Sequence, residues 1–493
     1  MVLLLTGGFF LSAQAGSENT GAAAYVIQSV DYRITGKTRP QALDRVLRPG
    51  VGQTLESLEE LEAHIAGKTR ELHNIRALTT EGSFIRYTLG EPGPQGTVPV
   101  YLEIFAVDSG NFIVLPEPKY DSNSGFSFSL KARDYNFLGS LSPLKFDLGW
   151  ETDEKDRRSV GFLLDMDLPF RALGYDWNVT FSHDFKYFFN APVYYKNITG
   201  LSIDFPLSFT VLRAGLEQGL VIHEENDLKD HIDDGEYHDW YLYSRVYGRW
   251  NIPTPLEAGP FGRVTYTPEL YVHSNYQPGG DVGPYRRGPT AGLNQRLGFE
   301  RIDWLGNFRQ GLKAELLAAH GYNTYYNDWD HSIGAAVQGH LRVSSLFGVS
   351  GRFMYTLWLD DSYTAGGDTI RGYRDDELRV KQRLSFNLDF PFRLIRFVPS
   401  EWTANPKVRY FDFEQHWSPF VDVLLVDAAG EGYAFSPGDT ISSLGLELIT
   451  FPLTWRSFYL RISAGWNIRE WIRTGQPPSG IHREIFIGLG YFY

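Results

Sequence analysis

The sequence of 493 residues contains no cysteine, so no disulfide can hold the fold together. A closed β-barrel needs none, because closure leaves no unpaired sheet edge. A run of about 18 consecutive apolar residues is also missing, which excludes a membrane-spanning helix. Basic residues are the minority, with 46 Lys and Arg against 59 Asp and Glu, which argues against a nucleic-acid partner.

The motifs of common enzyme classes are missing as well. The chain has no G-x-S-x-G elbow, no P-loop and no G-x-G-x-x-G turn. The acidic stretch His223–Asp239 lacks the regular spacing of a calcium loop, and no histidine pair has zinc-site spacing on one element. We therefore expect no enzymatic activity, no cofactor and no bound metal.

The sequence is rich in aromatic side chains and glycine. Aromatic residues make up 15% of the chain, with 29 Tyr, 34 Phe and 12 Trp, and there are 50 Gly. The mean hydropathy is nevertheless −0.27, so the chain is polar on average. This combination is typical of an all-β protein, and of a membrane β-barrel in particular.

The N-terminus has the pattern of a secretory signal. Val2–Leu11 is the longest largely apolar run, and the small residues of Ser12–Gly16 after it supply an A-x-A cleavage site. We expect residues 1–15 to be a signal peptide. The alternative is a disordered apolar N-terminus.

A small mixed domain is expected at residues 25–108, with a strand, two helices and two strands in that order. The helices are expected at Pro40–Leu47 and from Ser57 to Leu72, because Pro40 suits a first helical position and Ser57 can form a capping box. The order and length resemble a POTRA domain, the periplasmic module of outer-membrane insertases. The open sheet edge of such a domain can accept a client peptide as an extra strand. A plain spacer or anchor is the alternative.

Residues 111–493 show repeated segments of about ten residues in which apolar and polar side chains alternate, which predicts a transmembrane antiparallel β-barrel. Trp and Tyr gather near the ends of these segments, as they do at membrane interfaces. The final segment resembles the C-terminal signal of bacterial outer-membrane proteins, in which an aromatic residue closes the last strand. One face of this barrel-closing strand carries Ile485, Ile487, Leu489, Tyr491 and Tyr493.

The stretch Gly366–Leu378, with Ile370-Arg371-Gly372-Tyr373 at its centre, carries the most specific resemblance. Together with Phe420–Leu424 and Pro116–Gly125, it resembles the superfamily of BamA/TamA-type insertases and two-partner secretion translocators. The resemblance implies a barrel of sixteen strands, five of them after the Arg371 loop. We adopt this count although about eighteen segments are strand candidates.

The resemblance also implies that this loop folds back into the barrel lumen. There Arg371, followed by Gly372 and Tyr373, would pair with Asp422 and latch the barrel. Asn387 occupies the position of the family's second partner, a glutamate, so that charge is missing here. Glu447, on a later strand, could replace the missing charge.

Pro116 and Pro118 add an inference about the first barrel strand. Residues two apart in a strand direct their N–H groups to the same neighbour, and proline has no N–H. The first and last strands would then pair weakly and form a seam that could open sideways into lipid. The alternative is an extended linker between the two domains.

The resemblance implies a divergent, single-POTRA, monomeric barrel in the bacterial outer membrane, with the POTRA domain in the periplasm. It implies insertion or translocation of unfolded outer-membrane or secreted client proteins without nucleotide hydrolysis. Expected partners are the outer-membrane lipid bilayer, these clients and periplasmic accessory proteins, and no nucleic acid. A passive channel or structural surface protein on the same scaffold is an alternative, and so is a dedicated two-partner-type translocator.

Overall fold

The structure is a computed structural model. The residues it describes are 24–489, apart from gaps at 94–95, 122–124, 153–157, 190–191, 209, 224–239, 279–281, 283–285, 360–363, 366–368, 374–378, 429–434, 436–439, 458 and 480–481. The signal peptide expected at residues 1–15 lies outside the described residues, as do Tyr491 and Tyr493 of the barrel-closing strand.

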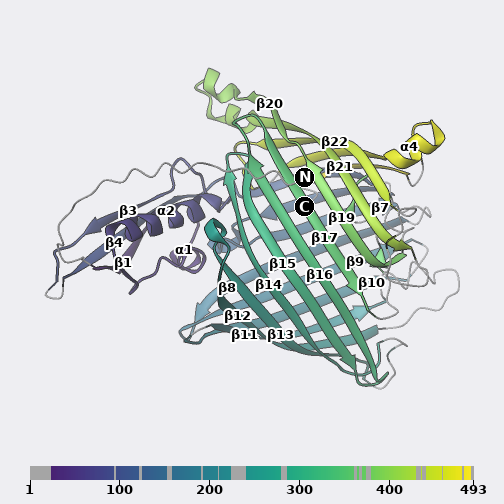
Figure 1. The fold of residues 1–493 in the computed structure, drawn as a ribbon, viewed down its shortest axis with the longest axis horizontal. Coiled ribbons are helices and arrows are strands. Elements are labelled where there is room, and N and C mark those ends of the chain that lie inside the picture. The colour runs from purple at the N-terminus through teal and green to yellow at the C-terminus, as the bar shows by residue number, and fades with distance from the viewer. Residues whose placement is uncertain are drawn as a thin grey trace.

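An α+β domain forms the N-terminal part of the described chain (Figure 1). Its elements are β1 (Ala24–Thr35), α1 (Pro40–Leu47), β2 (Thr54–Leu55), α2 (Leu58–Asn74), β3 (Phe84–Leu89) and β4 (Thr97–Val107). The sheet has the order β2-β1-β4-β3, with β1 and β4 parallel and the two outer pairs antiparallel. The sequence did not predict the two-residue β2.

The helices of this domain begin at a proline in one case and at a capping serine in the other, and they bury one face against the sheet. Pro40 occupies the first turn of α1, and the Ser57 hydroxyl accepts a hydrogen bond from the Glu60 N–H at 3.1 Å at the start of α2. The core between helices and sheet consists of two clusters of buried apolar side chains: Ile27, Leu55, Leu61, Ile65, Val100 and Leu102 in one, and Leu43, Leu47, Leu72, Leu78, Ile104 and Ala106 in the other.

The rest of the described chain is a nearly closed antiparallel β-barrel (Figure 1). Its wall strands are β5 (Phe112–Asp121), β6 (Gly125–Asp134), β7 (Leu144–Thr152), β8 (Arg158–Ala172), β9 (Tyr175–Phe188), β10 (Tyr194–Pro206), β11 (Val211–Ile222), β12 (Trp240–Glu257), β13 (Arg263–Tyr276), β14 (Thr290–Leu305), β15 (Phe308–Asn323), β16 (Asp328–Arg342), β17 (Gly348–Trp358), β19 (Arg379–Asp389), β21 (Phe413–Ala428), β22 (Ile441–Pro452), β23 (Leu460–Asn467) and β24 (Arg483–Leu489).

The described wall therefore has 18 strands, and the expected count of sixteen is wrong. The short β18 (Thr364–Ala365) and β20 (Phe392–Phe397) do not add to the wall, because β17 pairs directly with β19, and β19 with β21. After the Arg371 loop come β19, β21, β22, β23 and β24, as the resemblance implied. The two strands in excess of sixteen therefore precede the loop. In that part of the chain, the alternation of apolar and polar residues predicted the number of strands better than the resemblance did.

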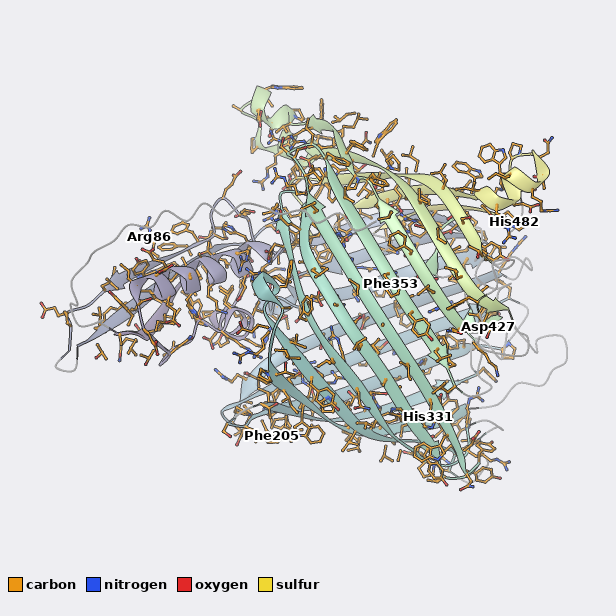
Figure 2. All side chains as sticks on the ribbon, viewed as in Figure 1. Arg86, Phe205, His331, Phe353, Asp427 and His482 are labelled. Atoms are coloured by element: carbon orange, nitrogen blue, oxygen red, sulfur yellow. The ribbon has the colours of Figure 1, made fainter. Side chains whose placement is uncertain are left out.

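The α+β domain sits at one end of the barrel, called the domain-side end, and α4 (Ile468–Thr474) lies at the opposite, far end (Figure 1). Figure 2 places Phe205 at the domain-side end, and His331, Asp427 and His482 toward the far end. Among the described residues, no helix is both long and apolar enough to cross a membrane.

Apolar side chains cover the outer face of the wall. Leu216 on β11 and Val246 on β12 are opposite each other in the strand register, and they are 52% and 59% exposed. Leu270 on β13 and Leu316 on β15 are likewise exposed. Adjacent strands that expose apolar residues on the same face are typical of a wall that meets lipid.

Hydrogen bonds join the α+β domain to the turn between β6 and β7. The side-chain amide of Asn136 donates to Thr38 Oγ1 at 2.6 Å and to Asp108 Oδ2 at 3.2 Å. The Arg45 guanidinium donates to the carbonyl oxygen of Ser140 at 2.7 Å. Because Asn136 and Thr38 are both buried, this junction excludes water and fixes the domain against the barrel.

Candidate functional site

Arg371 lies at the centre of a buried ionic cluster inside the barrel and is 1% exposed. Its Nε and Nη2 donate to the two carboxylate oxygens of Asp422 at 2.9 and 2.7 Å, and its backbone N–H also donates to Asp422 at 2.9 Å. Its Nη1 lies 2.7 Å from Asp389 Oδ1 and 3.0 Å from Glu447 Oε1. The guanidinium stacks on the Phe420 ring, 3.7 Å from its centroid. These five residues are the Arg371 cluster.

The balance of charge in the Arg371 cluster explains why an arginine can be buried there. Removing a guanidinium from water costs several kcal/mol unless carboxylates and hydrogen bonds compensate. Asp422 binds it as a bidentate fork, the strongest geometry for this pair. Arg461 on β23 supplies a second cation, since its Nη1 donates to Glu447 Oε1 at 3.2 Å while its guanidinium lies over the Phe486 ring.

Gly372 allows the loop to approach the wall closely. Its φ is +87°, and a Cβ at this position would lie 2.8 Å from the backbone nitrogen of Trp466. Its own N–H donates to Glu484 Oε2 on β24 at 2.9 Å. Gly445 on β22 gives room for the Phe420 ring, which a Cβ there would meet at 2.2 Å. Gly372 in the loop and Gly445 on β22 thus leave the space that the loop needs to pack against the barrel wall.

The structure brings Arg371 and Asp422 together and gives Asn387 a different partner. Asn387 lies opposite Asp422 in the register of β19 and β21, but its amide donates to the Thr369 carbonyl at 2.9 Å. The carboxylate of Asp389, two residues further along β19, contacts Arg371 instead. Residues two apart share one face of a strand, so the period of the strand was the signal that could have identified Asp389.

The remaining loop residues pack among apolar side chains. Ile370 is buried in a cluster with Val380, Leu424 and Ile441. Tyr373 is half-buried against this cluster, and its ring centroid lies 5.9 Å from that of His482. The loop is therefore held by packing as well as by its charges.

The first and last barrel strands meet at a short seam. In the described registers, β5 and β24 share a single pair, Asp121 with Phe486, whereas β5 pairs with β6 along its whole length from Phe112 to Asp121. Pro116 and Pro118 both belong to β5, so they lie in a barrel strand and not in a linker between domains.

The barrel-closing strand pairs well on its other side. Ile485 and Ile487 on β24 face Ala464 and Ile462 on β23, and Leu489 faces Leu460. The last strand is thus anchored to β23, whereas its strand register with β5 within the described residues is the single pair of Asp121 and Phe486.

Among the described residues, no group of three or more His, Asp, Glu or Cys side chains is arranged to hold a metal ion. Most of His223–Asp239, the acidic stretch considered as a metal site, lies outside the described residues.

No protein-family model matches the chain, and no curated protein matches it. Solved structures do match. CdiB from Acinetobacter baumannii has a TM-score of 0.50 at 12% identity, with 94% of this chain and 73% of that chain covered. BamA from Haemophilus ducreyi lacking POTRA domains 1-3 has a TM-score of 0.39 at 14% identity, covering 94% of this chain and 84% of that chain. CdiB from Escherichia coli has a TM-score of 0.40 at 10% identity, covering 97% and 92%. The likeness to the first of these shows a shared fold, a large β-barrel.

Proposed function

We propose that the chain is an outer-membrane β-barrel of the BamA/TamA-type superfamily that inserts or translocates unfolded client proteins. The observation that carries the proposal is the Arg371–Asp422 pair, buried inside the lumen as the loop motif implies. Its surroundings add support, because Asp389 supplies the charge that Asn387 lacks. The barrel lies in the bacterial outer membrane as a monomer, with the α+β domain in the periplasm.

The α+β domain acts as the POTRA domain of this barrel. In the described sheet, β3 is an edge strand that pairs only with β4, so its outer edge from Phe84 to Leu89 offers backbone donors and acceptors. An extended client segment can add there as a further strand, with affinity from main-chain hydrogen bonds. Periplasmic accessory proteins can deliver clients to the same edge.

The seam between β5 and β24 provides the route into lipid. Each backbone hydrogen bond contributes about 0.5–1.5 kcal/mol net, so separating strands that share a single register pair costs little. Pro116 and Pro118 remove two donors from β5. A client strand can therefore replace the β5–β24 contact with a longer ladder, and the work requires neither a nucleotide nor a catalytic residue.

A dedicated two-partner-type translocator is the second candidate, favoured by the fold likeness to CdiB from Acinetobacter baumannii. In that case the client would leave through the lumen and not through the seam. Both candidates use the same loop and the same α+β domain, so the identity of the client decides between them.

Depleting the protein and quantifying the outer-membrane and secreted proteomes tests the proposal. Broad loss of barrel proteins is expected for an insertase, and loss of one secreted protein for a dedicated translocator. Re-expression of the wild-type chain should restore either profile. Unchanged proteomes after complete depletion would contradict both candidates and favour a passive channel or a structural surface protein.

A further inference from the structure

The hairpin of β14 and β15 runs past the edge of the barrel wall. β13 pairs with β14 only as far as Gly298, although β13 itself begins at Arg263 and continues to pair with β12. β16 pairs with β15 only from Gly311 onward, although β16 continues to Arg342. Residues 299–310, named the mouth hairpin, form a two-stranded ladder that pairs neither with β13 nor with β16.

Gly311 makes the departure from the wall possible. Its φ is +137°, and a Cβ at this position would lie 1.9 Å from the carbonyl oxygen of Arg301 on the opposite strand. Only glycine can adopt this backbone conformation at such a close approach. The bend therefore sits at the base of the mouth hairpin, where the ladder separates from β16.

The tip of the mouth hairpin reaches a wall strand four positions away. The Phe308 ring lies 4.6 Å from the ring of His416 on β21, and both side chains are buried. Three wall strands, β16, β17 and β19, separate β15 from β21 along the barrel, so this contact crosses the inside of the barrel. Trp304 near the tip also meets Tyr459, at 6.5 Å between ring centroids, in the turn after β22.

The tip lies directly beside the Arg371 cluster. Asn307, Phe308 and Arg309 line a cavity of about 40 Å³ together with Asp389 and Glu447, the two carboxylates that share Arg371 Nη1. A water needs about 10–15 Å³ of such volume, so the space holds a few waters and no polypeptide. The space between the tip and the carboxylates of the Arg371 cluster is thus nearly filled.

Helix α2 of the α+β domain holds the mouth hairpin from outside. The Asn74 side chain at the end of α2 donates to Asp303 Oδ1 at 2.8 Å and accepts from the Trp304 N–H at 2.9 Å. Arg70 lies 3.4 Å from Asp303 Oδ2. Arg76 places its guanidinium 4.2 Å from the centroid of the Trp304 ring, a cation–π contact.

We propose that the mouth hairpin is a gate on the domain-side entrance of the barrel, held closed by α2. Its contacts with the domain include two hydrogen bonds, one ion pair and one cation–π stack, each worth about 0.2–1.5 kcal/mol. Movement of α2 when a client binds the α+β domain releases Asn74 from the hairpin and lets it swing away from His416. Water then reaches Asp389 and Glu447, so opening also loosens the Arg371 cluster.

The conductance of the purified full-length protein in planar lipid bilayers tests the gate. Removing the tip contacts with the double substitution Trp304→Ala and Phe308→Ala should raise the mean conductance several-fold. Leu207→Ala, in the domain-side turn between β10 and β11, is the matched control and should leave the conductance unchanged. A folded tip variant that conducts like the wild type would overturn the gate.

A second variant covers the case in which the double substitution does not fold. Arg76→Ala removes the stack on Trp304 and the hydrogen bond that Arg76 donates to the Arg456 carbonyl, and it leaves the barrel sequence intact. Since the chain has no cysteine, Asn307→Cys gives a unique thiol at the tip, and its labelling by a charged maleimide should become several-fold faster in the Arg76→Ala background. Equal labelling rates in both backgrounds would overturn the gate. Neither measurement needs a client, so a negative result would leave the proposed insertion or translocation untouched.

Discussion

Arg371 receives its carboxylates from three different strands, Asp389 on β19, Asp422 on β21 and Glu447 on β22. The neighbouring Gly372 adds a bond to Glu484 on β24. One short loop segment therefore ties together the part of the wall that ends at the seam. We propose that the loop acts as a latch on this part of the barrel, held by its charge pairs.

Arg371→Ala should destabilise the folded barrel. Breaking a buried ion pair by removing one partner costs about 3–5 kcal/mol, because the remaining carboxylates are left buried and uncompensated. Arg296→Ala is the matched control, since Arg296 is half-exposed in its pair with Glu315 and such a pair is worth about 0–1 kcal/mol. Heat-modifiability on gels and protease resistance measure the difference. If the Arg371→Ala variant were as resistant to heat and protease as the Arg296→Ala variant and the wild type, the proposal that the loop latches the barrel would be wrong.

At the scale of the elements, the sequence predicted local features better than contacts across the lumen. Alternation and the aromatic last strand predicted a barrel, and the structure has one. The resemblance supplied Arg371 and Asp422, whereas Asp389 was missed because the resemblance places the second partner at Asn387 and not at the next residue on the same strand face. The contact between Phe308 and His416 crosses the lumen, so no local pattern encodes it. Gly311, which permits it, is one glycine among 50.

The seam gives a prediction at the same scale. Asp121 and Phe486 are opposite each other in an antiparallel register, where Cα atoms lie about 4.5–5.5 Å apart, a distance that a disulfide can bridge. Oxidised Asp121→Cys/Phe486→Cys protein should fold but lose client insertion, and reduction should restore it. The control pair Val114→Cys/Ala132→Cys joins β5 to β6 and should leave activity intact when oxidised. An oxidised seam variant with full insertion activity would mean that clients do not leave through the seam.

At the scale of the whole molecule, the α+β domain and the barrel are joined at several separate places. One is the contact of α2 with the mouth hairpin, and another is the buried node of Thr38, Asp108 and Asn136 beside the turn after β6. In the turn between β22 and β23, Arg456 donates to the Leu78 carbonyl and Ser457 to the Arg76 carbonyl. Attachments at several places restrict rotation of the domain, because a hinge needs a single axis. Release of the α2 contact alone would then leave the domain attached through the other contacts.

Asn136→Ala should loosen the domain without unfolding either part. The substitution removes the donor to Thr38 and Asp108 from a buried site, which costs about 1–3 kcal/mol when the partners stay unsatisfied. We expect faster proteolytic cleavage between β4 and β5, and a broader distribution of distances between spin labels on the domain and the barrel. Lys68→Ala is the control, since its pair with Glu71 lies on the surface of α2 away from the node. A distance distribution as narrow as that of the wild type would contradict this prediction and show that the remaining contacts fix the domain without the Asn136 node.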